Sequence, residues 1–237
     1  MNGNGDPEVL ENAVRTLSLL LLSEETLEAT HGRVASLACR TLPPCDLASV
    51  TMVNDGRPTT PVQTDPLAGD LDSAQYRSRR GPCLEAYKAG KVVREKVCEN
   101  ADRWPEFSTI AAKAGVHSVL AVPLVANDQP IGALNLYSKS PGGYDEASEE
   151  TALLFSQQAA VACANAEVYW RTYSLTEHLR EALESRDVIG QAKGILMARR
   201  NCTPEAAFEM LRQASQHRNI KLRDIADQVV YLGDLDD

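Results

Sequence analysis

The residues best suited to chemistry in this chain are cations near its C-terminal end. Arg186, Lys193 and Arg200 recur every seven residues, so in a helix they align along the edge of one face. Further cations follow at Arg212, Arg218, Lys221 and Arg223. A line of cations beside a buried apolar stripe can track a phosphate backbone while the helix stays anchored. The alternative interpretation is a solvated helical face that happens to be basic.

The charge of the chain is divided unevenly along its length. Residues 186–223 hold eight basic and three acidic residues, a charge of +5, within a 237-residue chain of net charge −9, so the remainder carries −14. The acidic body argues against a general nucleic-acid binder, and against a peripheral membrane protein that uses basic patches. The asymmetry predicts two modules with different tasks.

Glycines and aromatic residues in the basic segment restrict how it could bind a ligand. Gly190 and Gly194 each cost a helix roughly 1 kcal/mol relative to alanine, which indicates close approach of either another helix or a ligand. The aromatic residues are only Phe208 and Tyr231, and we assign Phe208 to the core. This composition disfavours stacking on single strands and favours phosphate contacts and side-chain reading of unstacked loop bases.

The sequence offers no convergent set of nucleophile, base and metal ligands, so we expect no enzymatic activity, cofactor or metal. The six cysteines form no CxxC pair and no zinc-ligand spacing, which favours free thiols in a reducing cytoplasm. The apolar run at residues 17–22 is far shorter than the roughly 20 residues of a bilayer-spanning helix. The acidic residues before it do not fit a secretory signal. We therefore expect a cytoplasmic protein without membrane contact.

Three features leave a sensory role open beside a structural one. Cys83, after Gly-Pro, is either a redox- or ligand-sensing thiol or a packing residue. His117 is either a haem or metal ligand or an ordinary residue ahead of a strand. Arg77, Arg79 and Arg80 either attract an anionic ligand to a pocket mouth or belong to a solvated loop. In each case the structural role is favoured, because no neighbouring motif supports a sensory role.

The first two thirds of the chain alternate between helical and strand patterns. Helices are expected at 8–22, 24–41, 83–89 and within 103–115, and strands at 47–53, 60–64, 91–97, 118–125 and 131–138. Residues 65–82 are polar and turn-rich, and we expect a loop there. Helices at both ends with antiparallel strands between them predict an α+β domain with a central sheet flanked by helices.

A long helical tract follows from about Asp145 to Arg200, and it keeps a seven-residue apolar seam. The seam consists of Leu154, Val161, Val168, Leu175, Ala182 and Ile189. Such spacing suits helix pairing between two copies of the chain, and packing of the first half onto the sheet domain is the competing explanation. Thr203 and Pro204 then open a new helix, and a last one carries Leu222 to Val230. The end of the tract and these two helices predict a small three-helix bundle.

The basic segment resembles the ANTAR domain. The resemblance is carried by residues 185–197 (SRDVIGQAKGILM), 203–208 (TPEAAF), 211–212 (LR) and 221–226 (KLRDIA). ANTAR domains are three-helix RNA-binding outputs of bacterial regulators. The resemblance implies binding to paired RNA hairpins with short loops in nascent transcripts, which prevents terminator formation. Arg186, Lys193, Arg200, Arg212, Arg218, Lys221 and Arg223 are then the candidate RNA contacts.

The region before it resembles a GAF domain, a sensory cup with a sheet, flanking helices and a small-molecule pocket. The residues are 80–83 (RGPC), 118–124 (SVLAVPL) and 131–137 (IGALNLY). The order GAF then ANTAR is familiar from actinobacterial regulators. The signature of cyclic-nucleotide-binding members is not evident, so the ligand stays unknown.

These observations combine into one predicted organisation. We expect an N-terminal helix (1–23), a GAF-like sensory domain (24–167), a helical connector (168–175), an ANTAR domain (176–232) and an acidic tail (233–237). The predicted protein is a homodimeric regulator, in which a signal alters the pairing of the connector helices and so the joint engagement of two RNA hairpins. A DNA-binding helical output and a protein-interacting scaffold are the alternatives.

Overall fold

The computed structural model describes residues 7–20, 26–97, 99 and 101–235. Residues 1–6 lie outside the described residues. The same is true of the boundaries of the two predicted helices near residues 22 and 24, of Cys98, and of the last two residues of the predicted acidic tail. The chain divides into two units, residues 1–170 and residues 171–237.

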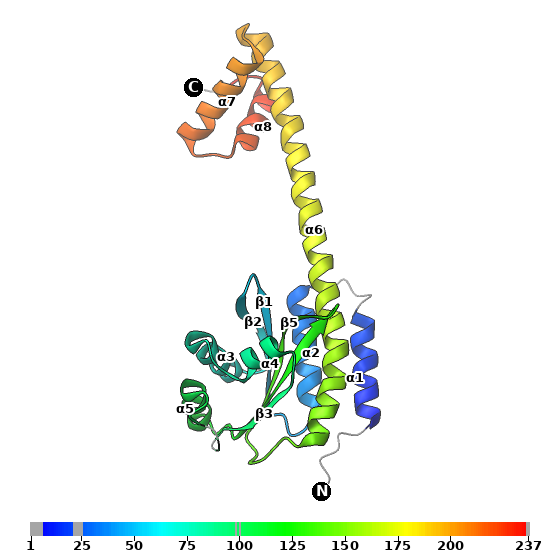
Figure 1. The fold of residues 1–237 in the computed structure, drawn as a ribbon. Coiled ribbons are helices and arrows are strands. Elements are labelled where there is room, and N and C mark those ends of the chain that lie inside the picture. Colours follow the sequence, from blue (N-terminus) through cyan, green and yellow to red (C-terminus); the bar gives the residue numbers. More distant parts are fainter. Residues whose placement is uncertain (1–6, 21–25, 98, 100, 236–237) are drawn as a thin grey trace. The chain divides into compact units, whose positions relative to one another are not determined.

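The first unit is built around a five-stranded sheet in which neighbouring strands are antiparallel, with the order β2-β1-β5-β4-β3 (Figure 1). The strands are β1 (Leu47–Asn54), β2 (Arg57–Gln63), β3 (Val93–Lys96), β4 (Ser118–Ala126) and β5 (Gln129–Ser138). Two-residue turns close the β1–β2 and β4–β5 hairpins, and Asp55, Asn127 and Asp128 there have the positive φ that such turns require. The predicted α+β architecture is confirmed.

Helices cover both faces of this sheet (Figure 1). One layer holds α1 (Pro7–Leu20), α2 (Leu27–Thr41) and the first part of α6 (Glu146–Arg200), and the other holds α3 (Pro66–Ser78), α4 (Pro82–Ala89) and α5 (Pro105–Lys113). Successive residues of a strand point to opposite faces of the sheet, so alternate side chains pack against the two helix layers. Leu134 and Leu136 pack with Phe155 of α6, whereas Tyr137 packs with Leu71 of α3.

Helix α3 corrects the expectation of a loop at residues 65–82. Its start has regular chemistry, because the Asp65 carboxylate accepts a hydrogen bond from the Leu67 backbone N–H at 2.9 Å and Pro66 occupies the first turn. The segment looks polar in sequence because the buried face of α3 includes Asp72 and Gln75 beside Leu71. Buried polar residues therefore hide the apolar periodicity on which helix prediction depends.

Burial leaves His31 on α2 without hydrogen-bond partners. The side chain is 2% exposed, and neither ring nitrogen has a partner among the described residues. Burial lowers the pKa of His31 from 6.5 to about 4, because the charged imidazolium is poorly solvated there.

The lowered pKa of His31 predicts a destabilising contribution of this residue in mild acid. Between pH 6.5 and about 4 the unfolded chain binds the His31 proton and the folded chain does not, so the contribution of His31 to the free energy of unfolding falls as the pH falls. It amounts to roughly 3 kcal/mol over the whole window. In urea-unfolding curves recorded between pH 4 and 7.5, the free energy of unfolding of His31→Leu relative to the wild type should be higher at pH 4 than at pH 7.5 by this amount. The exposed His217→Gln should show no such difference, and its absence in His31→Leu would contradict the assignment.

The second unit contains the end of α6, α7 (Pro204–Arg218) and α8 (Leu222–Leu232). Thr203 caps α7 by accepting a hydrogen bond from the Ala206 backbone N–H, and Pro204 stands in its first turn. The core combines Ala192 and Leu196 with Leu211 of α7 and Ile225 of α8. The long helix and the small bundle are thus confirmed.

The apolar seam of α6 remains largely exposed. In the first unit Leu154, Val161 and Val168 are 54%, 41% and 65% exposed, while the sheet is covered by a different face that includes Phe155 and Ala159. Packing onto the sheet domain therefore does not explain the seam. In the second unit Leu175, Leu179 and Leu183 are also exposed, and Ile189 joins the bundle core.

Candidate nucleic-acid interface

A groove in the second unit brings two predicted RNA contacts together. The groove has a volume of about 380 Å³, and Lys221 and Arg223 at the start of α8 line it. Helix α6 contributes the other wall through His178, Glu181, Ala182 and Ser185, and Asp224 completes it. We call this the α6–α8 groove. It has the residue types of a phosphate site, with two cations, an imidazole and a hydroxyl near two carboxylates.

The backbone of α8 adds partial positive charge to this groove, in which two cations face two carboxylates. Lys221 is the N-cap residue of α8, and its side chain makes no capping hydrogen bond. A helix N-terminus carries partial positive charge, which favours an anion near its first turn. The fixed dipole and the two cations therefore act at the same end of α8.

A second part of the candidate interface is one face of α6. Arg186, Gly190, Lys193 and Gly194 share this face by helical spacing. A Cβ atom added to either glycine would meet no atom within 4 Å, so close packing of another helix, one of the two readings of these glycines, is wrong within the described unit. Both glycines instead leave the helix backbone open to an approaching ligand.

Ion pairs hold Arg200 and Arg212, and Arg223 of the groove lies 3.9 Å from the Asp227 carboxylate. The Arg200 guanidinium donates two hydrogen bonds to Asp234, at 3.2 and 3.0 Å. This contact lowers the pKa of Asp234. Arg212 makes a bidentate pair with Glu209 on α7, at 2.8 and 2.6 Å. Arg218 is half-buried at the end of α7. The predicted contacts are thus unequal in their availability to phosphate.

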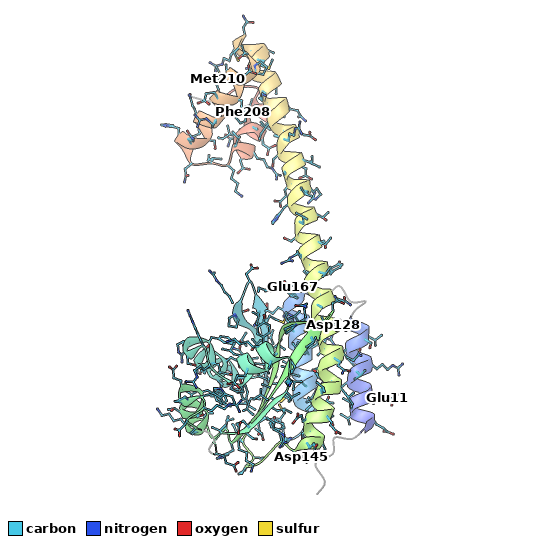
Figure 2. The ribbon with its side chains drawn as sticks, viewed as in Figure 1. Glu11, Asp128, Asp145, Glu167, Phe208 and Met210 are labelled. Carbon is cyan, nitrogen blue, oxygen red and sulfur yellow. The ribbon has the colours of Figure 1, made fainter. Side chains whose placement is uncertain are left out.

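The aromatic residues of the bundle differ from the expectation. Phe208, labelled on α7 in Figure 2, lies outside the core and is 39% exposed. Tyr231 is 89% exposed. The Lys193 Nζ atom stands 5.9 Å from the centre of the Phe208 ring, a cation–π contact that links α6 to α7. Assignment of Phe208 to the core was wrong because α7 turns Ala207 and Leu211 toward the bundle core, with Met210 and Ala214 packed against it. The ring is available for stacking beside a cation.

The first unit has a buried polar network on the side of the sheet that faces α3. The Asp72 carboxylate accepts hydrogen bonds from Tyr137 Oη at 2.5 Å, Asn135 Nδ2 at 3.0 Å and Thr60 Oγ1 at 2.8 Å. Gln75 then connects Tyr137 to the backbone N–H of Cys83. The network joins α3 to β2, β5 and the start of α4. None of these residues stood out in the sequence, because Asp72 and Gln75 lie in a segment that is polar throughout and Asn135 is a single polar residue in an apolar strand.

Burial raises the pKa of Asp72 from 3.8 to about 6, although its hydrogen bonds act in the opposite direction. The folded chain therefore binds this proton more tightly than the unfolded chain, and the contribution of Asp72 to stability is lost as the pH rises through about 6. Asp72→Asn should remove a stabilisation of roughly 3 kcal/mol that otherwise develops between pH 7 and 4. Urea unfolding at both pH values, with the exposed Asp70→Asn as control, measures it. Equal pH dependence in wild type and Asp72→Asn would contradict the raised pKa.

A surface groove lies next to this network, and we call it the sensor groove. It has a volume of about 380 Å³ and is lined at its edge by Arg57, Arg79 and Lys88, with Tyr76 at its inner wall. The Tyr76 hydroxyl hydrogen bonds with Thr51 at 2.8 Å and with Thr60 at 2.7 Å, which connects the groove to the Asp72 network.

The structure also places the other residues considered for sensing. Cys83 is fully buried, and burial raises the pKa of its thiol well above the ordinary value, which fits a packing role. Of the three arginines considered for sensing, only Arg79 lines the sensor groove. The Arg80 guanidinium instead donates a hydrogen bond to the backbone carbonyl of Arg103 at 3.0 Å. Across the described ranges, no group of three or more potential ligands, His117 included, is arranged to hold a metal ion.

Family comparisons assign both units. The family model of the GAF domain matches residues 24–164, more than half of the chain, and that of the ANTAR domain matches residues 177–230. The chain is a GAF–ANTAR protein. The resemblance seen in the sequence is therefore confirmed for both domains, and the α6–α8 groove and the Lys193–Phe208 contact belong to the ANTAR domain.

Curated relatives of the GAF–ANTAR protein include transcription regulators. The anaerobic nitric oxide reductase transcription regulator NorR of Escherichia fergusonii is 29% identical over 180 residues, which cover 70% of this chain and 34% of NorR. NorR of Escherichia coli (strain K12 / DH10B) is 34% identical over 124 residues, covering 52% and 24%. The chain spans about a third or less of the length of these relatives. Together with the family matches, they indicate a signal-sensing regulator.

Solved structures confirm the GAF fold. The GAF domain of a phosphoenolpyruvate-protein phosphotransferase from Coxiella burnetii superposes with a TM-score of 0.53 at 15% identity, over 69% of this chain and 98% of that one. Free methionine-R-sulfoxide reductase from Neisseria meningitidis gives 0.52 at 14% identity, over 71% and 98%. The fold thus occurs in an enzyme as well. No helix in the described part of the GAF–ANTAR protein is long and apolar enough to span a membrane.

Proposed function

We propose that this GAF–ANTAR protein is a signal-responsive, RNA-binding regulator. It binds paired hairpins with short loops in nascent transcripts, in the cytoplasm, and promotes transcription antitermination. The observation that carries the proposal is the α6–α8 groove, in which Lys221 and Arg223 meet at the N-terminus of α8 in a chain of net charge −9. Local concentration of positive charge on an acidic molecule favours a specific polyanion site over indiscriminate binding.

The two parts of the interface suit different parts of a hairpin. The α6–α8 groove holds a backbone phosphate, because its cations and the α8 dipole act on one point. The Phe208 ring beside Lys193 offers a stacking surface for an unpaired loop base. The open backbone at Gly190 and Gly194 lets the sugar–phosphate chain approach α6 closely between Arg186 and Lys193.

A homodimer supplies the second hairpin site. The exposed α6 residues Leu154, Val161 and Val168 recur at heptad spacing and are too apolar for a solvated helix face. Pairing of this seam between two copies buries it and joins two ANTAR domains in one assembly. Binding of one hairpin then raises the effective concentration of the second.

The sensor groove is the site proposed for the signal. Its three cations favour a small anionic molecule, and Tyr76 connects that molecule to the Asp72 network inside the GAF domain. The signal acts by changing the pairing of the α6 helices, and with it the joint binding of two hairpins.

RNA and DNA targets are distinguished by competition. The protein is titrated into a fluorescent two-hairpin RNA, and unlabelled hairpin RNA or duplex DNA of equal length is added at one fixed salt concentration. Hairpin RNA should compete at least tenfold better than duplex DNA. Better competition by duplex DNA would favour a DNA-binding output, and loss of all binding at physiological salt would favour a protein-interacting scaffold. A transcription assay on a leader with a terminator then tests antitermination.

A further inference from the structure

Two free cysteines lie together where α2 ends and β1 begins. Cys39 is in the last turn of α2, and Cys45 stands two residues before β1. The Cys39 Sγ atom donates to the backbone carbonyl of Cys45 at 3.5 Å, and the Cys45 Sγ atom donates to the carbonyl of Leu47 at 3.2 Å. Both thiols are therefore held within one short segment.

The exposure of these thiols separates them from the other cysteines of the GAF domain. Cys39 and Cys45 are half-buried, whereas Cys83 and Cys163 are completely buried. Cys39 and Cys45 line neither the sensor groove nor the α6–α8 groove. The pair thus combines two features of a reactive dithiol, namely proximity and access from solvent.

We propose that Cys39 and Cys45 form a redox-reactive dithiol, which an oxidant of the peroxide class converts into an intramolecular disulfide. Neither the sensing of a small molecule nor the binding of RNA depends on this modification. It gives the GAF domain a covalent, reversible state in addition to its proposed ligand.

The contacts of the two sulfur atoms differ. The Leu47 carbonyl holds the Cys45 S–H at 3.2 Å, whereas the Cys39 S–H meets its carbonyl acceptor only at 3.5 Å, and the Cys45 side chain lowers the pKa of Cys39. We therefore assign Cys39 as the attacking thiolate and Cys45 as the resolving thiol.

The reaction proceeds in two steps that balance. In the first, the Cys39 thiolate attacks the peroxide, an S–O bond forms as the O–O bond breaks, and the departing hydroxide takes up a proton to become water. Cys39 is then a sulfenic acid. In the second, the Cys45 sulfur attacks the Cys39 sulfur, an S–S bond forms, the S–O bond breaks, and the leaving hydroxide takes the Cys45 proton as a second water. The two sulfurs supply the two electrons that reduce the peroxide.

The position of the pair gives oxidation a structural consequence. A disulfide removes the Cys45 S–H that donates to the Leu47 carbonyl at the start of β1. Tyr144 precedes the start of α6 by two residues, is 4% exposed and lies beside Cys45. Its hydroxyl makes no hydrogen bond that meets the usual distance and angle limits within the described residues. Oxidation therefore changes contacts at the start of β1 and next to the first turn of α6.

Peptide mapping of the full-length protein tests the proposal. The protein is treated with hydrogen peroxide, remaining thiols are alkylated, and the sample is digested with trypsin without reduction. Cleavage after Arg40 places Cys39 and Cys45 in separate peptides, residues 34–40 and 41–77. We expect these two peptides joined, with the loss of two hydrogen atoms, and separated again by dithiothreitol.

Single variants test the order of attack. With Cys45→Ser the reaction should stop at the Cys39 sulfenic acid, which dimedone traps. With Cys39→Ser the dimedone adduct on Cys45 should be at least tenfold weaker. The buried Cys163→Ser is the matched control and should form the linked peptides at the wild-type rate.

Three outcomes would overturn the proposal. The first is the absence of linked peptides at a peroxide concentration that oxidises the half-buried Cys202. The second is a linkage of Cys39 or Cys45 to a third cysteine. The third is equal dimedone labelling of the two single variants. Because the first outcome is measured on the wild-type chain, the test stands even if a serine variant folds poorly.

Discussion

Replacement of Val161 and Val168 by glutamate should convert the proposed dimer into a monomer. Both side chains are exposed on the apolar seam of α6, so the substitutions place four like charges in the proposed interface of two copies without touching the core of either. Sedimentation velocity measures the change in mass, and circular dichroism at 222 nm checks that the fold persists.

The same variant should lose most of its affinity for a two-hairpin RNA. A monomer binds one hairpin at a time, so the gain from linked sites disappears, a loss of about 100-fold. Affinity for a single hairpin should stay within about twofold of the wild-type value, because the α6–α8 groove is unchanged. Fluorescence anisotropy with both RNAs measures the two values side by side.

A control places the same charges elsewhere on the GAF domain. Thr109 and Ala112 of α5 are exposed, and glutamates there should leave both the dimer and the two-hairpin affinity as in the wild type. A Val161→Glu, Val168→Glu protein that still sediments as a dimer would refute the seam as the interface.

Removal of both cations from the α6–α8 groove should weaken RNA binding more than removal of Arg212, because Arg223 meets Asp227 only at 3.9 Å whereas two hydrogen bonds hold Arg212 to Glu209. The Lys221→Ala, Arg223→Ala variant should lose about 30-fold in affinity near 100 mM salt, and the slope of log K against log salt should become shallower by roughly 1.5. The reason is that two phosphate contacts, with their released counterions, are lost together.

Arg212→Ala provides the matched control for charge. Its guanidinium is already held by Glu209 through two hydrogen bonds, so its removal should change affinity by less than about threefold. If Arg212→Ala weakens binding as much as the groove variant, RNA is attracted by total charge and the groove has no special role.

Regular local signals made much of the fold readable in the sequence. Thr203 and Pro204 mark the start of α7 by capping chemistry, and the nearly continuous apolar runs at 118–125 and 131–138 mark β4 and β5. Helix α3 was missed because Asp72 and Gln75 occupy buried positions that pattern analysis reserves for apolar residues. Their burial depends on partners from β2 and β5, which no local pattern reveals.

The sequence names the cations of the candidate site but not which of them lie together. Arg186 and Lys193 share a face of α6 as helical spacing requires. The approach of Lys221 and Arg223 to His178 and Ser185 depends on how α8 packs along α6, a tertiary contact across about forty residues. The exposure of Phe208 was likewise set by packing, because its helix presents Ala207 and Leu211 to the core instead.

The ion pair of Arg200 with Asp234 makes RNA binding at that arginine an exchange reaction. A phosphate that reaches the guanidinium must displace a carboxylate which already accepts two hydrogen bonds from it. One oppositely charged partner replaces another, and the freed Asp234 recruits a cation from solution as the phosphate gives one up. In the proposed RNA complex, binding at Arg200 is therefore nearly neutral in counterions, and we expect this end of the bundle to contribute geometry to recognition with little dependence on salt.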